Sequence, residues 1–252
     1  MYNDWLTIGN FTIHGYGVMI AIGILMAYFV GEKLAKKYGL ETDAVDTIIF
    51  MSVVFGFLGG KILYVLTVFD QFVNDPLPYL GGGGFVVYGG VILAIIVDWL
   101  YCRKKGYDFV RYFNVLAPCI ALAQGFGRIG CFFAGCCYGI ETHTFLDVHF
   151  PAGSLGPGPD VGSLPTQLIM SVGDFLIFFI LLKLQKNEKT FDITGAMYLV
   201  LYSVGRFLVE FLRGDMGRGF IGPLSEAQFI SVFIFLFGMY LIWRNQQKTM
   251  AI

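Results

Sequence analysis

The stretch GYGVMIAIGILMAYFVGEKLAKK, residues 15–37, decides the fold class of this chain. Residues 15–31 carry no charged side chain, and the stretch ends in three lysines at 33, 36 and 37. About 20 mostly apolar residues suffice to cross the hydrocarbon core of a bilayer. No Lys or Arg precedes the run, so it lacks the basic start of a cleaved signal peptide. We therefore predict that it stays in the membrane as a helix.

The composition of the whole chain agrees with a membrane protein. Of its 252 residues, 56% are hydrophobic and only 14% are charged, whereas a soluble domain carries about 25% charged residues. Seventeen Lys and Arg nearly balance eighteen Asp and Glu, so no bulk positive charge points to a nucleic-acid partner. We expect residues 1–252 to form one polytopic membrane domain.

Seven segments are long and apolar enough to be read as membrane spans. They cover residues 15–35, 45–66, 86–102, 112–131, 166–184, 192–212 and 223–243. The third is short and follows the glycine-rich run GGGGFVVYGG, residues 81–90. Irregular backbone at membrane depth persists only where protein or a wet cavity surrounds it. An outer loop over 67–90 with a re-entrant glycine segment is therefore expected; a flexible linker is the alternative.

The basic residues set the orientation of these spans. Twelve of the seventeen follow the first, third, fifth and seventh spans: Lys33, Lys36, Lys37, Arg103, Lys104, Lys105, Arg111, Lys183, Lys186, Lys189, Arg244 and Lys248. Lys and Arg collect on the cytoplasmic side of membrane proteins. We expect an all-α integral membrane fold of seven transmembrane helices, with the N-terminus outside and the C-terminus cytoplasmic. The Gly- and Pro-rich residues 140–165 then form a small irregular extracytoplasmic cap.

Four further basic residues, Lys61, Arg128, Arg206 and Arg213, fall within or at the outward ends of the even-numbered spans. A basic side chain at membrane depth is costly unless it faces a cavity or a partner. Arginine predominates, which suits forked recognition of phosphate oxygens. The pattern predicts an anion site in the outer half of the bilayer, with snorkelling toward the interface as the alternative.

The sixth span carries polar groups at helical spacing. Tyr202, Arg206, Glu210 and Arg213 fall on one stripe if the helix is continuous. Glu210 can pair with either arginine, so a purely structural charge cluster is one interpretation. The other is a ligand site, because the net positive charge leaves one arginine for an anion.

The fourth span ends in GFGRIGCFFAGCCYG, residues 125–139, whose glycines leave room for close approach of a neighbour or a ligand. Three interpretations compete for Cys131, Cys136 and Cys137. They are small packing residues, reactive thiols favoured by nearby arginines, or metal ligands together with His143 and His149. The spacing matches no common zinc pattern, so we expect no metal.

In chain order these segments resemble the prolipoprotein diacylglyceryl transferase family. These bacterial inner-membrane enzymes move diacylglyceryl from phosphatidylglycerol onto the lipobox cysteine of a prolipoprotein signal peptide. The matching stretches are HGYGVMIAIG (14–23), GGKILY (59–64), GFVVYGG (84–90), GRIGCFFAGCCYG (127–139), PTQL (165–168), YSVGRFLVEFLRGD (202–215) and LSEAQFIS (224–231). The likeness covers nearly the whole chain, and the family shares the seven-span, N-out topology.

The resemblance implies roles for the matching positions. Its catalytic candidates are Tyr16, Tyr88, Arg128, Cys136 and Arg206. Its substrate-binding candidates are Lys61, Arg128, Cys131, Cys137, Gly139, Gln167, Tyr202, Arg206, Glu210 and Arg213. No cofactor is implied.

The chain departs from the family at several of these positions. Tyr88 replaces a histidine that is a candidate base, and Lys61 stands where the family usually has arginine. Cys131 and Ala134 replace signature asparagines, and Cys136 replaces a signature glutamate. The histidine of an H-P dipeptide is Leu164 here. The phosphate-binding pattern is thus kept, while groups near the reacting centre are replaced by thiols and a phenol.

The expected function is a phospholipid-dependent transferase in the bacterial inner membrane, acting on phosphatidylglycerol and a prolipoprotein. Two alternatives remain. One is a lipid-modifying enzyme with a different acceptor, in which Cys136 or Cys137 is a reactive thiol. The other is a non-catalytic, lipid-binding helix bundle built on the same arginines.

Overall fold

A computed structural model describes residues 3–9, 11–81, 84–215 and 219–250. Seven helices in these ranges have 17 or more residues: α1 (Gly15–Tyr38), α2 (Thr42–Thr67), α5 (Val87–Lys105), α6 (Phe109–Ala134), α7 (Thr166–Gln185), α9 (Thr194–Glu210) and α10 (Glu226–Met250). The shorter ones are α3 (Phe69–Asn74), α4 (Pro76–Gly81) and α8 (Glu188–Phe191). Three antiparallel strand pairs complete the described fold: β1 (Asp4–Ile8) with β2 (Phe11–His14), β3 (Val148–His149) with β4 (Gly162–Ser163), and β5 (Phe220–Ile221) with β6 (Leu224–Ser225).

Each predicted span coincides with one of the seven long helices. Five of these helices, α1, α2, α6, α7 and α10, are long and apolar enough to cross a membrane. The protein is therefore helical and of the integral membrane class. Helix α9, with 17 residues, and helix α5 fall outside that set.

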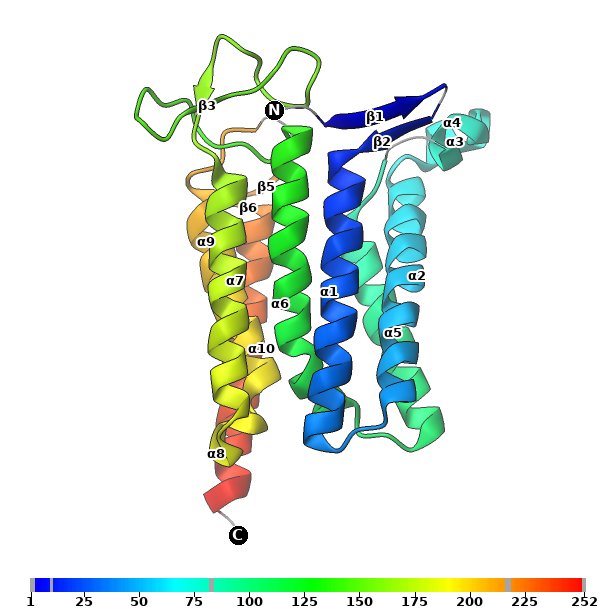
Figure 1. The fold of residues 1–252 in the computed structure, drawn as a ribbon, viewed down its shortest axis with the longest axis vertical. Helices are drawn as coiled ribbons and strands as arrows, with labels where there is room; N and C mark the ends of the chain where they lie inside the picture. Colours follow the sequence, from blue (N-terminus) through cyan, green and yellow to red (C-terminus); the bar gives the residue numbers. More distant parts are fainter. Residues whose placement is uncertain (1–2, 10, 82–83, 216–218, 251–252) are drawn as a thin grey trace. The chain divides into compact units, whose positions relative to one another are not determined.

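The chain divides into two compact units, Met1–Gly31 with Asn114–Ile252, and Glu32–Phe113. In the first unit, α9 packs against both α7 and α10. The non-helical residues 135–165 connect α6 to α7 and contain β3 and β4. Figure 1 shows this connection at the end of the unit where α6 stops and α7 starts. The segment predicted as a cap over 140–165 thus lies directly over the end of α6 that carries the cysteines.

The second unit contains the predicted outer loop over 67–90. Two short helices, α3 and α4, occupy much of it, and residues 82–83 lie outside the described part of the chain. Helix α5 begins at Val87, so Tyr88 and the two glycines after it are helical rather than irregular. Entry of this segment into the membrane stays a prediction.

Glycines bring α2 and α5 into close contact within the second unit. A Cβ added to Gly59 would lie 2.4 Å from Gly89 O, and one added to Gly89 would lie 2.4 Å from Gly59 O. Small residues at such positions let helix backbones approach each other. The glycine run that reads as a linker therefore contributes part of a helix–helix contact.

We expect Gly59→Ala to lower the thermal unfolding midpoint of the detergent-solubilised protein, because the added methyl meets backbone of α5 at a cost of about 1–3 kcal/mol. Gly56→Ala is the matched control on the same helix, since its Cβ meets nothing within 4 Å. An unchanged midpoint for Gly59→Ala would contradict the contact.

Candidate functional site

The end of α6 turns sharply and leaves two cysteines beyond the helix. Gly135 takes a left-handed conformation with φ 80°, and its N–H donates to Phe132 O at 3.3 Å, as in a helix C-terminal cap. Cys137 also has a left-handed backbone, with φ 60°. Non-glycine residues adopt this conformation infrequently. Cys131 therefore stays on the helix, while Cys136 and Cys137 lie on a tight turn after it.

The turn gathers the three thiols of Cys131, Cys136 and Cys137. Their Sγ atoms all lie within 4.8 Å of one another, and all three cysteines are free and partly buried. The Cys131 and Cys136 thiols donate hydrogen bonds to Cys137, and, with Arg213 and Arg128 nearby, they hold the pKa of the Cys137 thiol well below its ordinary value. Hydrogen bonding with Cys131 and Cys137 raises the pKa of the Cys136 thiol. The prediction that nearby arginines favour the thiolate form is therefore met at Cys137.

The first turn of α7 holds this turn in place. Thr166 Oγ1 donates to Cys137 O at 2.7 Å, and Gln167 Nε2 donates to Cys136 O at 2.7 Å. Both side chains are fully buried. Gln167, expected at the substrate, instead contacts the backbone that carries the thiols.

Gly139 lies where three backbone segments meet. Its N–H donates to Leu164 O at 2.9 Å, and it forms a β-bridge with Arg213. The next residue, Ile140, donates to Leu212 O at 2.9 Å. A Cβ on Gly139 would lie 2.6 Å from Leu164 O, so a side chain does not fit. Gly139, expected to bind substrate, here lets the thiol turn approach the end of α9.

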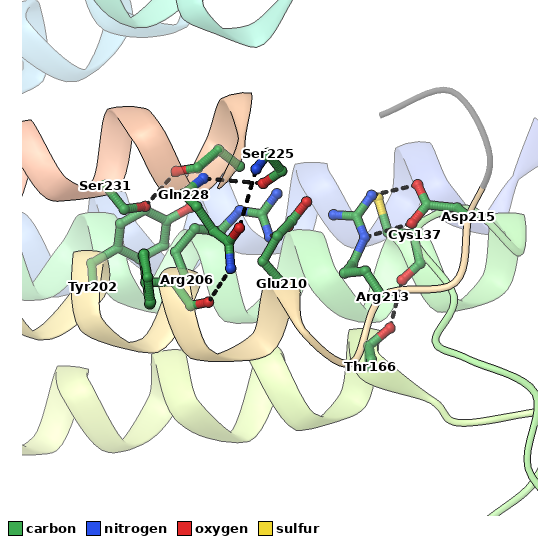
Figure 2. Close-up of polar contacts among 12 residues, drawn as sticks. Cys137, Thr166, Tyr202, Arg206, Glu210, Arg213, Asp215, Ser225, Gln228 and Ser231 are labelled. Atoms are coloured by element: carbon green, nitrogen blue, oxygen red, sulfur yellow. Dashed lines mark hydrogen bonds and ion pairs between the residues drawn. The ribbon is translucent and has the colours of Figure 1, made fainter. Parts of the chain in front are cut away.

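Arg213 is not on the helical stripe that its spacing predicts. Helix α9 ends at Glu210, because the backbone after it pairs with the segment that follows the cysteines instead of continuing the helix. Figure 2 shows Arg213 beyond the last turn of α9, with Asp215 and Cys137 beside its guanidinium. Arg213 Nε donates to Asp215 Oδ1 at 2.6 Å, and its Nη2 donates to Asp215 Oδ2. The expectation that the stripe leaves one arginine without a carboxylate partner is therefore wrong.

Arg206 and Glu210 remain on α9 and form an ion pair one turn apart. The Glu210 side chain is only 3% exposed. Gln228 of α10 lies beside this pair (Figure 2), donating from Nε2 to Phe207 O at 3.5 Å and accepting from Ser225 N at 3.1 Å. The carboxylate thus holds the Arg206 guanidinium in one orientation at the contact of α9 with α10.

Arg128 and Arg206 share one neighbourhood. Arg128 Nη2 lies 3.5 Å from the Tyr202 hydroxyl, to which it donates. Tyr202 and Arg206 both line a hollow of about 50 Å³ between α7 and α9, and Asp174 lies there as well. The other lining residues are Ile169, Met170, Gly173, Ile177, Gly205 and Val209.

Asp174 was not among the sequence candidates, although it is a lone acid inside an apolar span. It is buried, lines the hollow, and lies within electrostatic range of Arg128. Its Oδ2 has no hydrogen-bond partner within the described ranges. Asp215 and Thr166 were also missed, because only the folded turn brings them to Arg213 and Cys137.

Tyr16 lies in the first turn of α1, close to the three thiols. A Cβ on Gly130 would lie 3.1 Å from Tyr16 O, so α1 and α6 approach closely at this level. The half-exposed Tyr16 side chain lies within electrostatic range of Arg128 and of all three thiols. Arg128 in turn lies within range of Cys131 and Cys137. The structure therefore joins the expected Tyr16, Arg128 and the thiols into one site.

Lys61 and Tyr88 belong to the second unit. Lys61 Nζ donates to Gly84 O at 3.3 Å and lies over the Tyr64 ring. Tyr88 is in the first turn of α5 and is 40% exposed. Their part in an anion or catalytic site stays a prediction.

Comparisons with known proteins agree on one family. The family model for prolipoprotein diacylglyceryl transferase matches residues 4–244. A Clostridium tetani relative named phosphatidylglycerol–prolipoprotein diacylglyceryl transferase is 42% identical over 230 residues, which are 90% of this chain and 91% of the relative. A Clostridium perfringens relative, named phosphatidylglycerol–prolipoprotein diacylglyceryl transferase 2, is 41% identical over 238 residues. These residues are 94% of this chain and 92% of the relative. A Staphylococcus carnosus relative with that name is 34% identical over 93% of this chain and 87% of its own.

We expect Gly139→Ala to lower the thermal unfolding midpoint, because its methyl would press on Leu164 O at a cost of about 1–3 kcal/mol. Gly127→Ala is the matched control in the same glycine-rich segment, since its Cβ meets nothing within 4 Å. Equal midpoints for the two variants would show that the backbone junction at Gly139 tolerates a side chain.

Proposed function

Because the chain belongs to the prolipoprotein diacylglyceryl transferase family, we propose that Arg128 and Arg206 hold the phosphate of its phospholipid substrate. The chain is a transferase that moves diacylglyceryl from phosphatidylglycerol to the lipobox cysteine of a prolipoprotein. The 3.5 Å contact of Arg128 with Tyr202 carries the proposal. It puts Arg128 beside the hollow that Arg206 lines, and Arg128 also lies within electrostatic range of the thiols.

Arg128 is the better candidate for the first phosphate contact. Its hydrogen-bond partner is the neutral hydroxyl of Tyr202, whereas Arg206 and Arg213 are each paired with a carboxylate. A phosphate oxygen replaces a hydroxyl at an arginine more easily than it replaces a carboxylate, because charge-assisted bonds are the stronger ones. Arg206, oriented by Glu210, then supplies a second positive charge at the hollow.

The reaction joins an acceptor sulfur to a glyceryl carbon. The acceptor thiol loses its proton, its thiolate attacks the carbon, and the bond between that carbon and the phosphate oxygen breaks. The electron pair leaves with the oxygen, giving glycerol phosphate. Arginines placed at that oxygen stabilise the charge that develops on it in the transition state.

Three further residues are candidates for roles in the reaction. Tyr88 is the candidate base for the acceptor thiol. Lys61 is the candidate third cation at the phosphate. Tyr16 lies close enough to the thiols and Arg128 to contact an acceptor that enters there.

The proposed topology follows from the distribution of basic residues. All seven long helices cross the bacterial inner membrane as one polytopic domain, with the N-terminus outside and the C-terminus in the cytoplasm. Residues 140–165 then form an extracytoplasmic cap over the thiols, and 67–90 an outer loop with a re-entrant part. The clusters of Lys and Arg at the C-terminal ends of α1, α5 and α7 support this orientation.

Purified wild-type protein should transfer labelled diacylglyceryl from phosphatidylglycerol to a lipobox peptide. In Arg128→Ala we expect a drop in kcat of about 10²–10³, the usual cost of removing one group that stabilises transition-state charge. Arg128→Lys should recover part of the rate, because it restores charge without the fork. Arg103→Ala, which removes a guanidinium stacked on Trp99 in the other unit, is the control. A wild-type rate in Arg128→Ala would overturn the assignment.

The topology predicts opposite labelling of two introduced cysteines. Phe145→Cys lies in the cap at a side chain that is 94% exposed, and Glu188→Cys lies in α8, after α7. In intact cells, a membrane-impermeant maleimide should add to the first variant above the wild-type background. The second should react only after permeabilisation. The reverse pattern would invert the orientation.

A further inference from the structure

Three thiols at the end of α6 form a group that arginine-based phosphate binding does not require. The Sγ atoms of Cys131, Cys136 and Cys137 lie within 4.8 Å of one another. Three thiolates bound to one tetrahedral zinc ion at ~2.3 Å would be separated by about 3.8 Å. The sulfurs are therefore at most about 1 Å farther apart than the ligands of one zinc ion.

The backbone around these thiols is unusually constrained. Cys137 has a left-handed backbone conformation, with φ 60°, which glycine adopts far more readily than other residues. Gly135, two residues earlier, has a left-handed backbone as well. This turn folds Cys137 back toward Cys131 on the helix. A non-glycine residue in this strained conformation is typical of functional sites.

Two buried side chains of α7 fix the carbonyls of the turn. Thr166 Oγ1 binds Cys137 O and Gln167 Nε2 binds Cys136 O, each at 2.7 Å. In metal sites, hydrogen bonds from neighbouring residues help to orient the ligands. The two hydrogen bonds from α7 orient the backbone of Cys136 and Cys137 in a similar way. The backbone of two of the three cysteines is therefore held in place before any ion arrives.

The surrounding charge suits a thiolate-bound dication. Three thiolates and one Zn²⁺ leave one net negative charge, and Arg128 and Arg213 lie within electrostatic range of Cys137. Thiolate sulfur is a preferred ligand of zinc, whereas Mg²⁺ and Ca²⁺ prefer oxygen. The chemistry of the donors thus selects zinc over the harder dications.

The group offers three protein ligands within the described part of the chain. His149 Nδ1 lies 2.8 Å from Pro159 O, and His143 is a largely exposed side chain 3.8 Å from Glu141. Neither histidine belongs to the thiol group. Structural zinc sites have four protein ligands, whereas catalytic sites keep three and leave one position open.

We propose that Cys131, Cys136 and Cys137 bind Zn²⁺ and that the open fourth position takes the acceptor cysteine of the lipobox. This inference rests on the proposed function and names how that acceptor is activated.

The proposed zinc ion would activate the acceptor sulfur for the transfer step. The acceptor thiol gives up its proton to the proposed base as it coordinates, because zinc binds the thiolate form. The bound thiolate then donates an electron pair to the glyceryl carbon, forming the S–C bond, while the C–O bond to phosphate breaks. The product is a thioether, a weaker ligand than a thiolate, so it leaves the metal. Zinc is neither oxidised nor reduced.

The binding test uses full-length protein in detergent, first stripped of metal with a chelator and then titrated with Zn²⁺ or with Co²⁺ as a spectroscopic probe. We expect about one tightly bound ion per chain and a thiolate-to-cobalt charge-transfer band, as metal binding requires deprotonated cysteines. Cys131→Ser, Cys136→Ser and Cys137→Ser should each weaken binding and the band. Cys119→Ser, a buried thiol earlier in α6, is the control. Metal binding equal to the control in all three variants would overturn the site.

The acceptor test follows the cobalt spectrum as peptide is added. A lipobox peptide with cysteine should strengthen the charge-transfer band, while the same peptide with serine should leave it unchanged. Because this comparison uses wild-type protein, it does not depend on whether a serine variant folds. An identical response to both peptides would overturn the fourth-ligand role.

The activity of the same preparations separates this inference from the proposed function. Loss of transfer in the metal-free protein and its return with Zn²⁺ support both. Equal transfer with and without metal overturns the zinc inference and leaves the transferase. A cysteine-specific cobalt response without any transfer supports the site and contradicts the proposed reaction.

Discussion

The cost of placing guanidinium groups in an apolar bundle is the constraint on which the site depends. Each arginine needs a partner or a cavity, and the fold supplies a different one in each case. Glu210 pairs with Arg206, Asp215 pairs with Arg213, and the Tyr202 hydroxyl accepts from Arg128. These pairings fix where positive charge lies, and therefore where a lipid phosphate can bind.

The positions of these partners follow from one backbone junction. The segment after the cysteines pairs with the segment after α9, so the helix stops at Glu210 and Arg213 comes to Cys137. Gly139 makes this junction possible because a side chain there would meet Leu164 O. The thiol turn and the arginines are thus parts of one folded unit rather than separate features.

The sequence predicts the helices better than it predicts the site. The membrane requires long apolar helices, and the seven predicted segments each coincide with a long helix. The place of Arg213 could not be predicted, because periodicity assumes that the helix continues, whereas backbone pairing far along the chain ends it. The partner Asp174 was missed because contacts between helices leave no periodic signal, and Asp215 because it lies beyond the end of α9, where helical spacing does not apply. The lone acid in α7, Asp174, was the one visible clue.

Charge also limits how the substrate can bind. Three guanidiniums face Glu210, Asp215 and the buried Asp174, so little excess positive charge remains. Breaking a buried ion pair is costly because it leaves an uncompensated charge. A phosphate that instead replaces the Tyr202 hydroxyl at Arg128 breaks no ion pair. Since Arg128 also lies within electrostatic range of Cys131 and Cys137, a phosphate bound there would lie close to the thiol group.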